Sequence, residues 1–127
     1  MYKQEIKERV NKINKFPEEV QYIVDALDDK RAKDIVVLDL QEVSESLEYF
    51  IIASGESSLQ INALEQNVKE HLRENGYRVN GIEGPSQKWI LMDYGFTVVH
   101  IMSPEAREFY DLEGLWADAE SLEVVPN

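Results

Sequence analysis

Four residues of the 127-residue chain could handle a nucleotide, because they stand where an expected strand gives way to a turn. Ser54 and Gly55 follow the apolar run 49–53 and precede a helix start, where backbone amides can meet a phosphate. Asp39 and Asp93 each end an expected strand and could hold Mg²⁺ for phosphoryl transfer. One hypothesis is therefore a nucleotide-binding or nucleotidyltransferase-type enzyme that uses these four residues.

The surrounding sequence weighs against that enzyme. Neither the phosphate-loop pattern G-x-x-x-x-G-K-[ST] nor the dinucleotide pattern G-x-G-x-x-G occurs. Neither aspartate belongs to an Asp-x-Asp pair, and Glu56 would repel a phosphate group. We therefore favour ordinary capped turns at these positions and expect no catalytic residue, no metal and no cofactor. The enzyme remains the alternative.

The two histidines, His71 and His100, are too far apart in sequence to form a local ligand pair. His71 falls on the apolar side of an expected helix, where a boundary histidine is more common than a ligand. His100 interrupts an apolar strand, but no paired acid or nucleophile stands beside it, so we favour a hydrogen-bonded structural histidine over a general acid or base. The chain has no cysteine, which excludes disulfides and thiolate metal sites.

An aromatic hairpin is the strongest candidate for a binding surface. Side chains alternate along a strand, so Trp89 and Leu91 point to one face and Ile90 and Met92 to the other. Exposed aromatic and leucine side chains beside carboxylates are typical of a protein-binding hot spot. The alternative is that the last helix, with Phe109, Leu112 and Trp116, covers that face. The sequence leaves these two interpretations open.

The charge of the chain indicates what kind of partner it can bind. With 13 Lys+Arg against 25 Asp+Glu the net charge is −12, and residues 35–127 hold five basic against seventeen acidic side chains. The segment 105–123 holds seven acids and one arginine. Such a field repels nucleic acid and anionic lipid and favours a basic protein partner. The alternative is that these acids only form a solvated face.

Pattern and length predict a single α/β domain with a mixed β-sheet of about five strands flanked by helices. We expect a helical extension over residues 1–16, the main domain over 17–119 and an acidic, frayed tail over 120–127. The start of the chain lacks the apolar stretch of a secretory signal. We therefore expect a soluble, cytoplasmic protein.

Helix and strand signals divide the main domain further. Pro17 opens one helix, Ser57 with Gln60 caps a second, Gly76 ends it, and Ser103 caps the last. The segment 49–53, the second helix and a weaker strand over 78–82 predict a right-handed crossover with parallel strands. Segments 89–92 and 97–102 predict an antiparallel hairpin, with Gly95 in its turn. The last helix should use Phe109, Leu112, Leu115 and Trp116 as apolar anchors.

Several ordered motifs resemble one known family. They are Val37-Leu38-Asp39-Leu40, Tyr49-Phe50-Ile51-Ile52-Ala53-Ser54-Gly55, Trp89-Ile90-Leu91-Met92-Asp93-Tyr94-Gly95, Val99-His100-Ile101, Glu105-Ala106-Arg107-Glu108-Phe109-Tyr110-Asp111-Leu112-Glu113 and Leu115-Trp116. Together these motifs resemble the ribosomal silencing factor family, RsfS or Iojap-like, over about residues 18–119. Their common order and spacing are far more specific than any one of them.

This resemblance implies a non-catalytic domain with nucleotidyltransferase-like topology. Members of the family bind the large ribosomal subunit through its fourteenth protein, block joining of the small subunit and so repress translation. They are commonly homodimers when free. Carried over by motif, the partner-binding residues are Trp89, Leu91, Asp93, Tyr94, Glu105, Arg107, Glu108 and Tyr110. From the negative charge of the chain we expect no membrane partner and no direct sequence-specific contact with nucleic acid.

Three features depart from the pattern of the family. Phe96 stands where a polar or acidic residue is expected, and this could alter the hairpin tip. Gly114 stands where a basic residue is common, which makes the carboxyl end more acidic. Residues 1–16 look like an extension.

Overall fold

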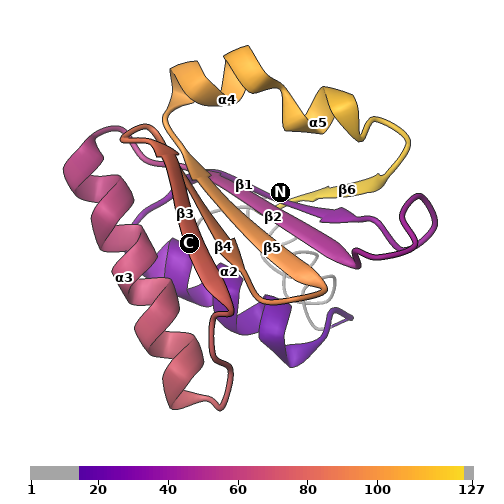
Figure 1. Cartoon of the computed structure of the whole chain (residues 1–127), viewed down its shortest axis with the longest axis horizontal. Coiled ribbons are helices and arrows are strands. Elements are labelled where there is room, and N and C mark those ends of the chain that lie inside the picture. The colour runs from indigo at the N-terminus through magenta and orange to yellow at the C-terminus, as the bar shows by residue number, and fades with distance from the viewer. Residues whose placement is uncertain (1–14, 125–127) are drawn as a thin grey trace, which may run out of the picture.

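The computed structural model describes residues 15–124, which form a sheet between two helical layers (Figure 1). Helices α2 and α3 lie on one side of the sheet, and the short helices α4 and α5 lie on the other. The elements in chain order are α2 (Glu18–Asp29), β1 (Lys33–Asp39), β2 (Tyr49–Ser54), α3 (Ser58–Glu74), β3 (Gly81–Ser86), β4 (Trp89–Asp93), β5 (Thr97–Met102), α4 (Pro104–Tyr110), α5 (Leu112–Leu115) and β6 (Glu120–Glu123). The expected helix over Ile6, Val10 and Ile13 lies outside the described residues.

The described strands form one six-stranded mixed sheet in the order β3-β4-β5-β2-β1-β6. Its centre is the parallel pair β2 and β5, in register from Tyr49 opposite Thr97 to Ser54 opposite Met102. The other neighbours are antiparallel, which confirms the β4–β5 hairpin. The mixed α/β sheet is therefore confirmed, with one strand more than expected.

The crossover after α3 differs from the expectation in two ways. The strand that follows α3 is β3 at Gly81–Ser86, later in the chain than the predicted segment 78–82. It pairs with β4 at the edge of the sheet, and β4 and β5 separate it from β2. The connection from β2 through α3 to β3 thus passes over the positions of β4 and β5. Local sequence patterns do not show that these two later strands lie between β2 and β3.

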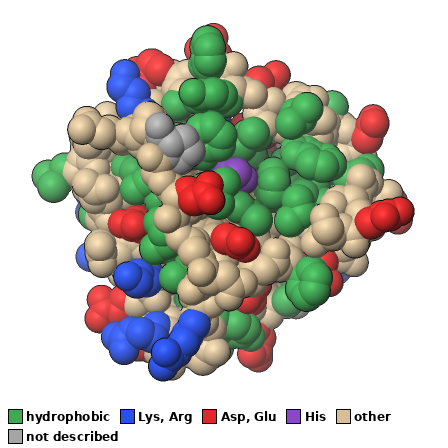
Figure 2. Space-filling model, in the orientation of Figure 1, with side chains coloured by type: hydrophobic (Ala, Val, Ile, Leu, Met, Phe, Trp, Pro, Cys, Tyr) green, Lys and Arg blue, Asp and Glu red, His purple; other side chains and the backbone are tan. Residues whose placement is uncertain are grey.

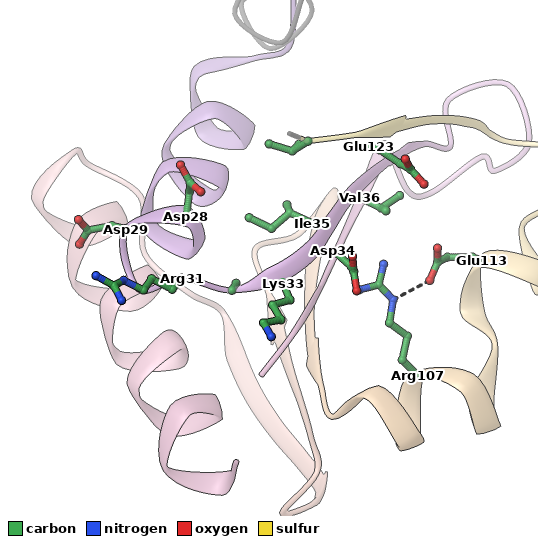
Figure 3. Close-up of a pocket in the computed structure, with 12 residues that line it drawn as sticks. Asp28, Asp29, Arg31, Lys33, Asp34, Ile35, Val36, Arg107, Glu113 and Glu123 are labelled. Carbon is green, nitrogen blue, oxygen red and sulfur yellow. Dashed lines mark hydrogen bonds and ion pairs between the residues drawn. The ribbon is translucent and has the colours of Figure 1, made fainter. Parts of the chain in front are cut away.

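Strand β6 corrects a second expectation. We expect the chain to fray after Asp118, but residues 120–123 pair antiparallel with β1, from Glu120 opposite Asp39 to Glu123 opposite Val36. Charge made this segment look like a solvated tail, whereas Leu122 and Val124 pack into the core below the sheet. The end of β6 borders a cavity of about 1020 Å³ between α2, β1 and the α4–α5 segment (Figure 3).

The pleat of the sheet separates two apolar cores. The larger core joins Ile51, Val99 and Ile101 to buried residues of α2 and α3. The smaller core, under α4 and α5, is built from Phe50, Ile52, Val98 and other residues of the opposite face. Figure 2 shows hydrophobic side chains in the space between the sheet and the α4–α5 segment, so this second layer is only partly closed.

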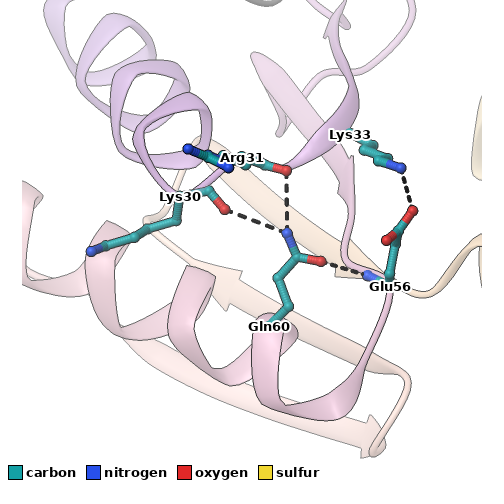
Figure 4. Close-up of polar contacts among 5 residues, drawn as sticks. All are labelled: Lys30, Arg31, Lys33, Glu56 and Gln60. Atoms are coloured by element: carbon teal, nitrogen blue, oxygen red, sulfur yellow. Dashed lines mark hydrogen bonds and ion pairs between the residues drawn. The ribbon is translucent and has the colours of Figure 1, made fainter.

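Two side chains hold the start of α3: Ser57 caps the helix, and Gln60 connects it to the loop after α2. Ser57 Oγ accepts a hydrogen bond from the backbone N–H of Gln60 at 3.1 Å, which confirms the predicted cap. Gln60 Oε1 accepts from the Glu56 amide at 2.7 Å, and its Nε2 donates to the Arg31 carbonyl at 3.2 Å (Figure 4). Lys33 forms an ion pair with Glu56 beside this group. One glutamine therefore joins α3 to the loop after α2.

We expect Gln60→Ala to lower the free energy of unfolding by about 1–2 kcal/mol, because it leaves these backbone groups without partners. The matched control is Gln66→Ala, an exposed position of the same helix, which should leave stability almost unchanged. Urea unfolding followed by circular dichroism measures both. Equal stability of the two variants would contradict the role of Gln60.

Candidate functional site

The face of the sheet under α4 and α5 is half covered. Leu112 and Trp116 pack toward the sheet, and the Trp116 ring meets the Phe50 ring edge-on with centroids 6.0 Å apart. Trp89 and Leu91, on β4, stay partly exposed on the same face. Both interpretations of the hairpin are thus partly realised, because the last helices cover the side toward β1 and leave the side toward β4 open.

The open side continues onto α4 as an aromatic surface, which we define as Trp89, Leu91, Phe109 and Tyr110. The Tyr110 ring contacts the Trp89 ring with centroids 4.6 Å apart, and Phe109 meets Tyr110 at 5.0 Å. Phe109 is 82% exposed and Tyr110 48%. In Figure 2 acidic side chains, with a basic side chain at the upper left, lie near the hydrophobic side chains in the upper part of the molecule. Large exposed aromatic side chains of this kind are typical of a contact surface.

The expectation that Phe109 and Leu115 anchor the last helix in the core is wrong. Phe109 and Leu115 are 82% and 74% exposed, whereas Leu112 and Trp116 do pack inward. The reason is a break at Asp111, which takes a left-handed conformation with φ 44° and accepts a hydrogen bond from the Gly114 amide. The break splits the expected helix into α4 and α5, so one helical periodicity cannot assign the faces of both.

His100 lies beneath the aromatic surface and is 3% exposed. Its Nδ1 accepts a hydrogen bond from Trp89 Nε1 at 3.2 Å, and the Phe50 ring packs against it with centroids 4.5 Å apart. Burial lowers the pKa of His100 to about 4, so the imidazole is neutral at neutral pH. The predicted structural, hydrogen-bonded histidine is therefore what the structure shows.

Arg107 holds α4 in place and does not face outward. Its Nη1 donates to Ser54 Oγ at 3.0 Å, and its Nε donates to Glu113 Oε1 at 2.8 Å. The side chain is 12% exposed. Arg107 therefore links the end of β2, α4 and α5, and it borders the cavity of Figure 3 together with Glu113.

The remaining predicted site residues fall in different places. Glu105 and Glu108 are exposed on α4, next in sequence to the aromatic surface. Asp93, at the far end of β4 from Trp89, accepts a hydrogen bond from the Gly95 amide at 2.7 Å. Tyr94 is buried in the core on the α2–α3 side of the sheet, where burial first and then Glu19 raise its pKa to about 12. The structure therefore does not bring Tyr94 together with Trp89.

The four residues of the alternative enzyme do not converge. Asp39 and Asp93 lie on strands separated by β5 and β2, which places them about 14 Å apart by ordinary strand spacing. Each accepts a hydrogen bond from a backbone amide two residues on, as expected of a capped turn. Ser54 lies at the opposite end of β2 from the Asp39 register position and is bonded to Arg107.

Gly55 has a packing role. A Cβ on Gly55 would lie 2.8 Å from Ile61 Cγ1, so the absence of a side chain allows the first turn of α3 to approach the end of β2. Among residues 15–124, no group of three or more histidine and carboxylate side chains could hold a metal ion. Nor does any helix within that range have the length and apolar character needed to cross a membrane.

The protein is therefore a single α/β domain with a six-stranded mixed sheet, one face of which is incompletely covered and carries exposed aromatic side chains. The family described as "Ribosomal silencing factor during starvation" matches residues 13–127. A Bacillus subtilis relative, "Ribosomal silencing factor RsfS", is 42% identical over 95 residues, covering 74% of this chain and 80% of the relative. The chain belongs to the ribosomal silencing factor family.

Other comparisons agree on fold and family. A crystal structure of a Chromobacterium violaceum protein matches with a TM-score of 0.76 and 37% identity, covering 85% of this chain and 91% of that one. The mouse "Mitochondrial assembly of ribosomal large subunit protein 1" is 32% identical over 102 residues, which cover 77% of this chain and 45% of that protein. These findings confirm the resemblance seen in the sequence motifs.

The lowered pKa of His100 predicts a stability that falls in mild acid. The unfolded chain takes up a proton near the ordinary pKa of 6.5, whereas the folded chain resists protonation until about 4. The contribution of neutral His100 is therefore complete above pH 6.5 and is lost as pH falls from 6.5 toward 4. Between pH 7 and pH 5 we expect a loss of about 2 kcal/mol from this residue.

Urea unfolding at both pH values, for the natural chain and for His100→Phe, measures this loss. The carboxylates contribute equally to both proteins, so the difference between their pH dependences isolates the histidine. Parallel pH profiles would show that His100 is not the group responsible.

Proposed function

We propose that this chain binds the large ribosomal subunit through a basic protein of that subunit, the fourteenth, and blocks joining of the small subunit by occupying space. The result is repression of translation without a chemical step. The observation that carries the proposal is the aromatic surface, which α4 and α5 leave open on one face of the sheet. Family membership supports a role on the ribosome.

Charge supports a basic protein as the docking partner. Glu105 and Glu108 are exposed on α4 beside Phe109 and Tyr110, so carboxylates stand next to the apolar contact area. A rim of one sign steers a partner of the opposite sign and speeds association, while the aromatic centre supplies desolvated area. Arg107, on the same helix, adds little positive charge to this surface, because its guanidinium is turned inward and bonded to Glu113 and Ser54.

The proposal divides the motif residues by their position. Trp89, Leu91 and Tyr110 would contact the partner, with Glu105 and Glu108 at the rim. Arg107 would hold α4 in position. Asp93 would shape the hairpin turn, and Tyr94 would serve the core, so neither is needed at the contact.

A second copy of the chain would occupy the same surface when no ribosome is present. Such a homodimer would shield Phe109, which is otherwise 82% exposed, and would separate when the large subunit binds. The proposed place of action is the cytoplasm, where subunits join. The alternative enzyme gains no support from the geometry, because its four residues lie on separate parts of the sheet.

We expect Trp89→Ala and Tyr110→Ala each to weaken binding to purified large subunits about 10- to 100-fold, because each removes a large aromatic contact. Both variants should also restore joining of the small subunit. The matched control is Leu59→Ala, an 81% exposed leucine on α3 in the opposite layer. Co-sedimentation and sucrose-gradient profiles measure both effects. Unchanged inhibition by both aromatic variants would remove the aromatic surface from the mechanism.

We expect the double change Glu105→Lys and Glu108→Lys to slow association with the large subunit about tenfold or more at low salt and to reduce its salt dependence. The control is Glu70→Lys with Glu74→Lys, two exposed acids of α3 that change the net charge by the same amount. Stopped-flow association at two salt concentrations separates a local rim effect from net charge. Equal slowing by both pairs would show that only the overall field matters.

A further inference from the structure

The hydrogen bond between Trp89 and His100 joins a partly exposed side chain to a buried one. Trp89 begins β4 and His100 lies on β5, two residues along from Met102, the cross-strand partner of Trp89. The two side chains are therefore diagonal neighbours on one face of the sheet. The hydrogen bond of 3.2 Å runs from the indole Nε1 to the imidazole Nδ1.

Hydrogen-bond chemistry fixes the tautomer of His100. An indole nitrogen can only donate, so Nδ1 must be the acceptor and carry no proton. The single proton of the neutral ring then sits on Nε2. This Nε2 is buried and has no hydrogen-bond partner among the described residues. His100 therefore keeps one polar atom satisfied and leaves the other without a partner.

This arrangement is unfavourable for the fold on its own. A buried donor without an acceptor destabilises a protein, and a phenylalanine ring would fill the same place against Phe50 without that penalty. What a phenylalanine would lose is the acceptor for the Trp89 indole. The imidazole at position 100 thus supplies an acceptor that orients Trp89, which a phenylalanine at the same place would not supply.

We propose that His100 is a positioning residue for docking: it fixes the Trp89 indole, through the bond from Nε1 to Nδ1, in the orientation that the ribosomal partner contacts. The inference rests on the proposed function, since it assigns to His100 a role at the same surface. His100 itself, at 3% exposure, never touches the partner.

The effect of His100 extends beyond one ring. The fixed indole packs against the Tyr110 ring at 4.6 Å, and Tyr110 in turn meets Phe109 at 5.0 Å. Trp89 is therefore the link between the rigid sheet and the exposed aromatic side chains of α4. A side chain already held in its bound orientation loses less freedom on binding, so the complex is tighter.

Two variants separate orientation from stability. His100→Phe keeps a ring beside Phe50 and removes the acceptor, whereas His100→Asn keeps a short-range acceptor and removes the ring. We expect His100→Phe to be at least as stable as the natural chain, because the unpartnered Nε2 is gone, yet to bind large subunits about five- to tenfold more weakly. His100→Asn should be less stable but should bind more tightly than His100→Phe.

The Trp89 indole gives a second measurement that needs no ribosome. In ¹H–¹⁵N spectra we expect the Trp89 indole N–H signal to shift and broaden in His100→Phe and to keep a single sharp position in His100→Asn. A Trp116→Phe variant assigns the two indole signals. If the natural chain does not bind large subunits, the proposed function fails, while these spectra still test whether His100 orients Trp89.

Two results would overturn the inference. One is a His100→Phe variant with an unchanged Trp89 signal and unchanged binding. The other is a binding order that follows stability, with His100→Asn weaker than His100→Phe, because His100 would then act only through the fold.

Discussion

The alternation of side chains across the sheet is the constraint on which the rest of this structure depends. Every central strand is buried on both faces, so each must find a cover above and below. On one side α2 and α3 provide that cover with two long apolar stripes. On the other side, within residues 15–124, the cover comes from the helices α4 and α5, of seven and four residues. Their small length leaves the β4 end of that face open, and the aromatic surface lies there.

Exposed charges beside this opening determine which kind of partner it favours. Glu105 and Glu108 are exposed on α4, while Arg107 of the same helix is turned inward to Ser54 and Glu113. One cation therefore stabilises the junction of β2, α4 and α5 without neutralising the outer surface. An acidic rim beside exposed aromatic rings suits a basic protein and opposes a bare phosphate backbone. The same field that looks like a solvated tail in the sequence thus supports the ribosomal role of the family.

The pair of Trp89 and His100 shows how a binding surface can depend on a buried residue. The core on this face carries the imidazole of His100, whose Nε2 has no hydrogen-bond partner within residues 15–124, although an apolar ring would fit the packing. At position 100, packing alone would favour an apolar ring, whereas the orientation of Trp89 requires a hydrogen-bond acceptor. The histidine supplies that acceptor. Residues of this kind are invisible in a list of surface contacts, because their effect passes through a neighbour.

The sequence by itself determined the local parts of this protein. Ser57 and Ser103 marked helix starts, Gly76 and Gly95 marked turns, and alternation placed Trp89 on one face of its strand, because each signal depends only on near neighbours. The motifs also identified the family. Only the tertiary structure decided what depends on distant pairing. It inserted β4 and β5 between β2 and β3, placed β6 against β1, turned Phe109 outward and put the acceptor for Trp89 on the neighbouring strand. Strand order and side-chain partners arise from long-range packing, which no local period in the chain encodes.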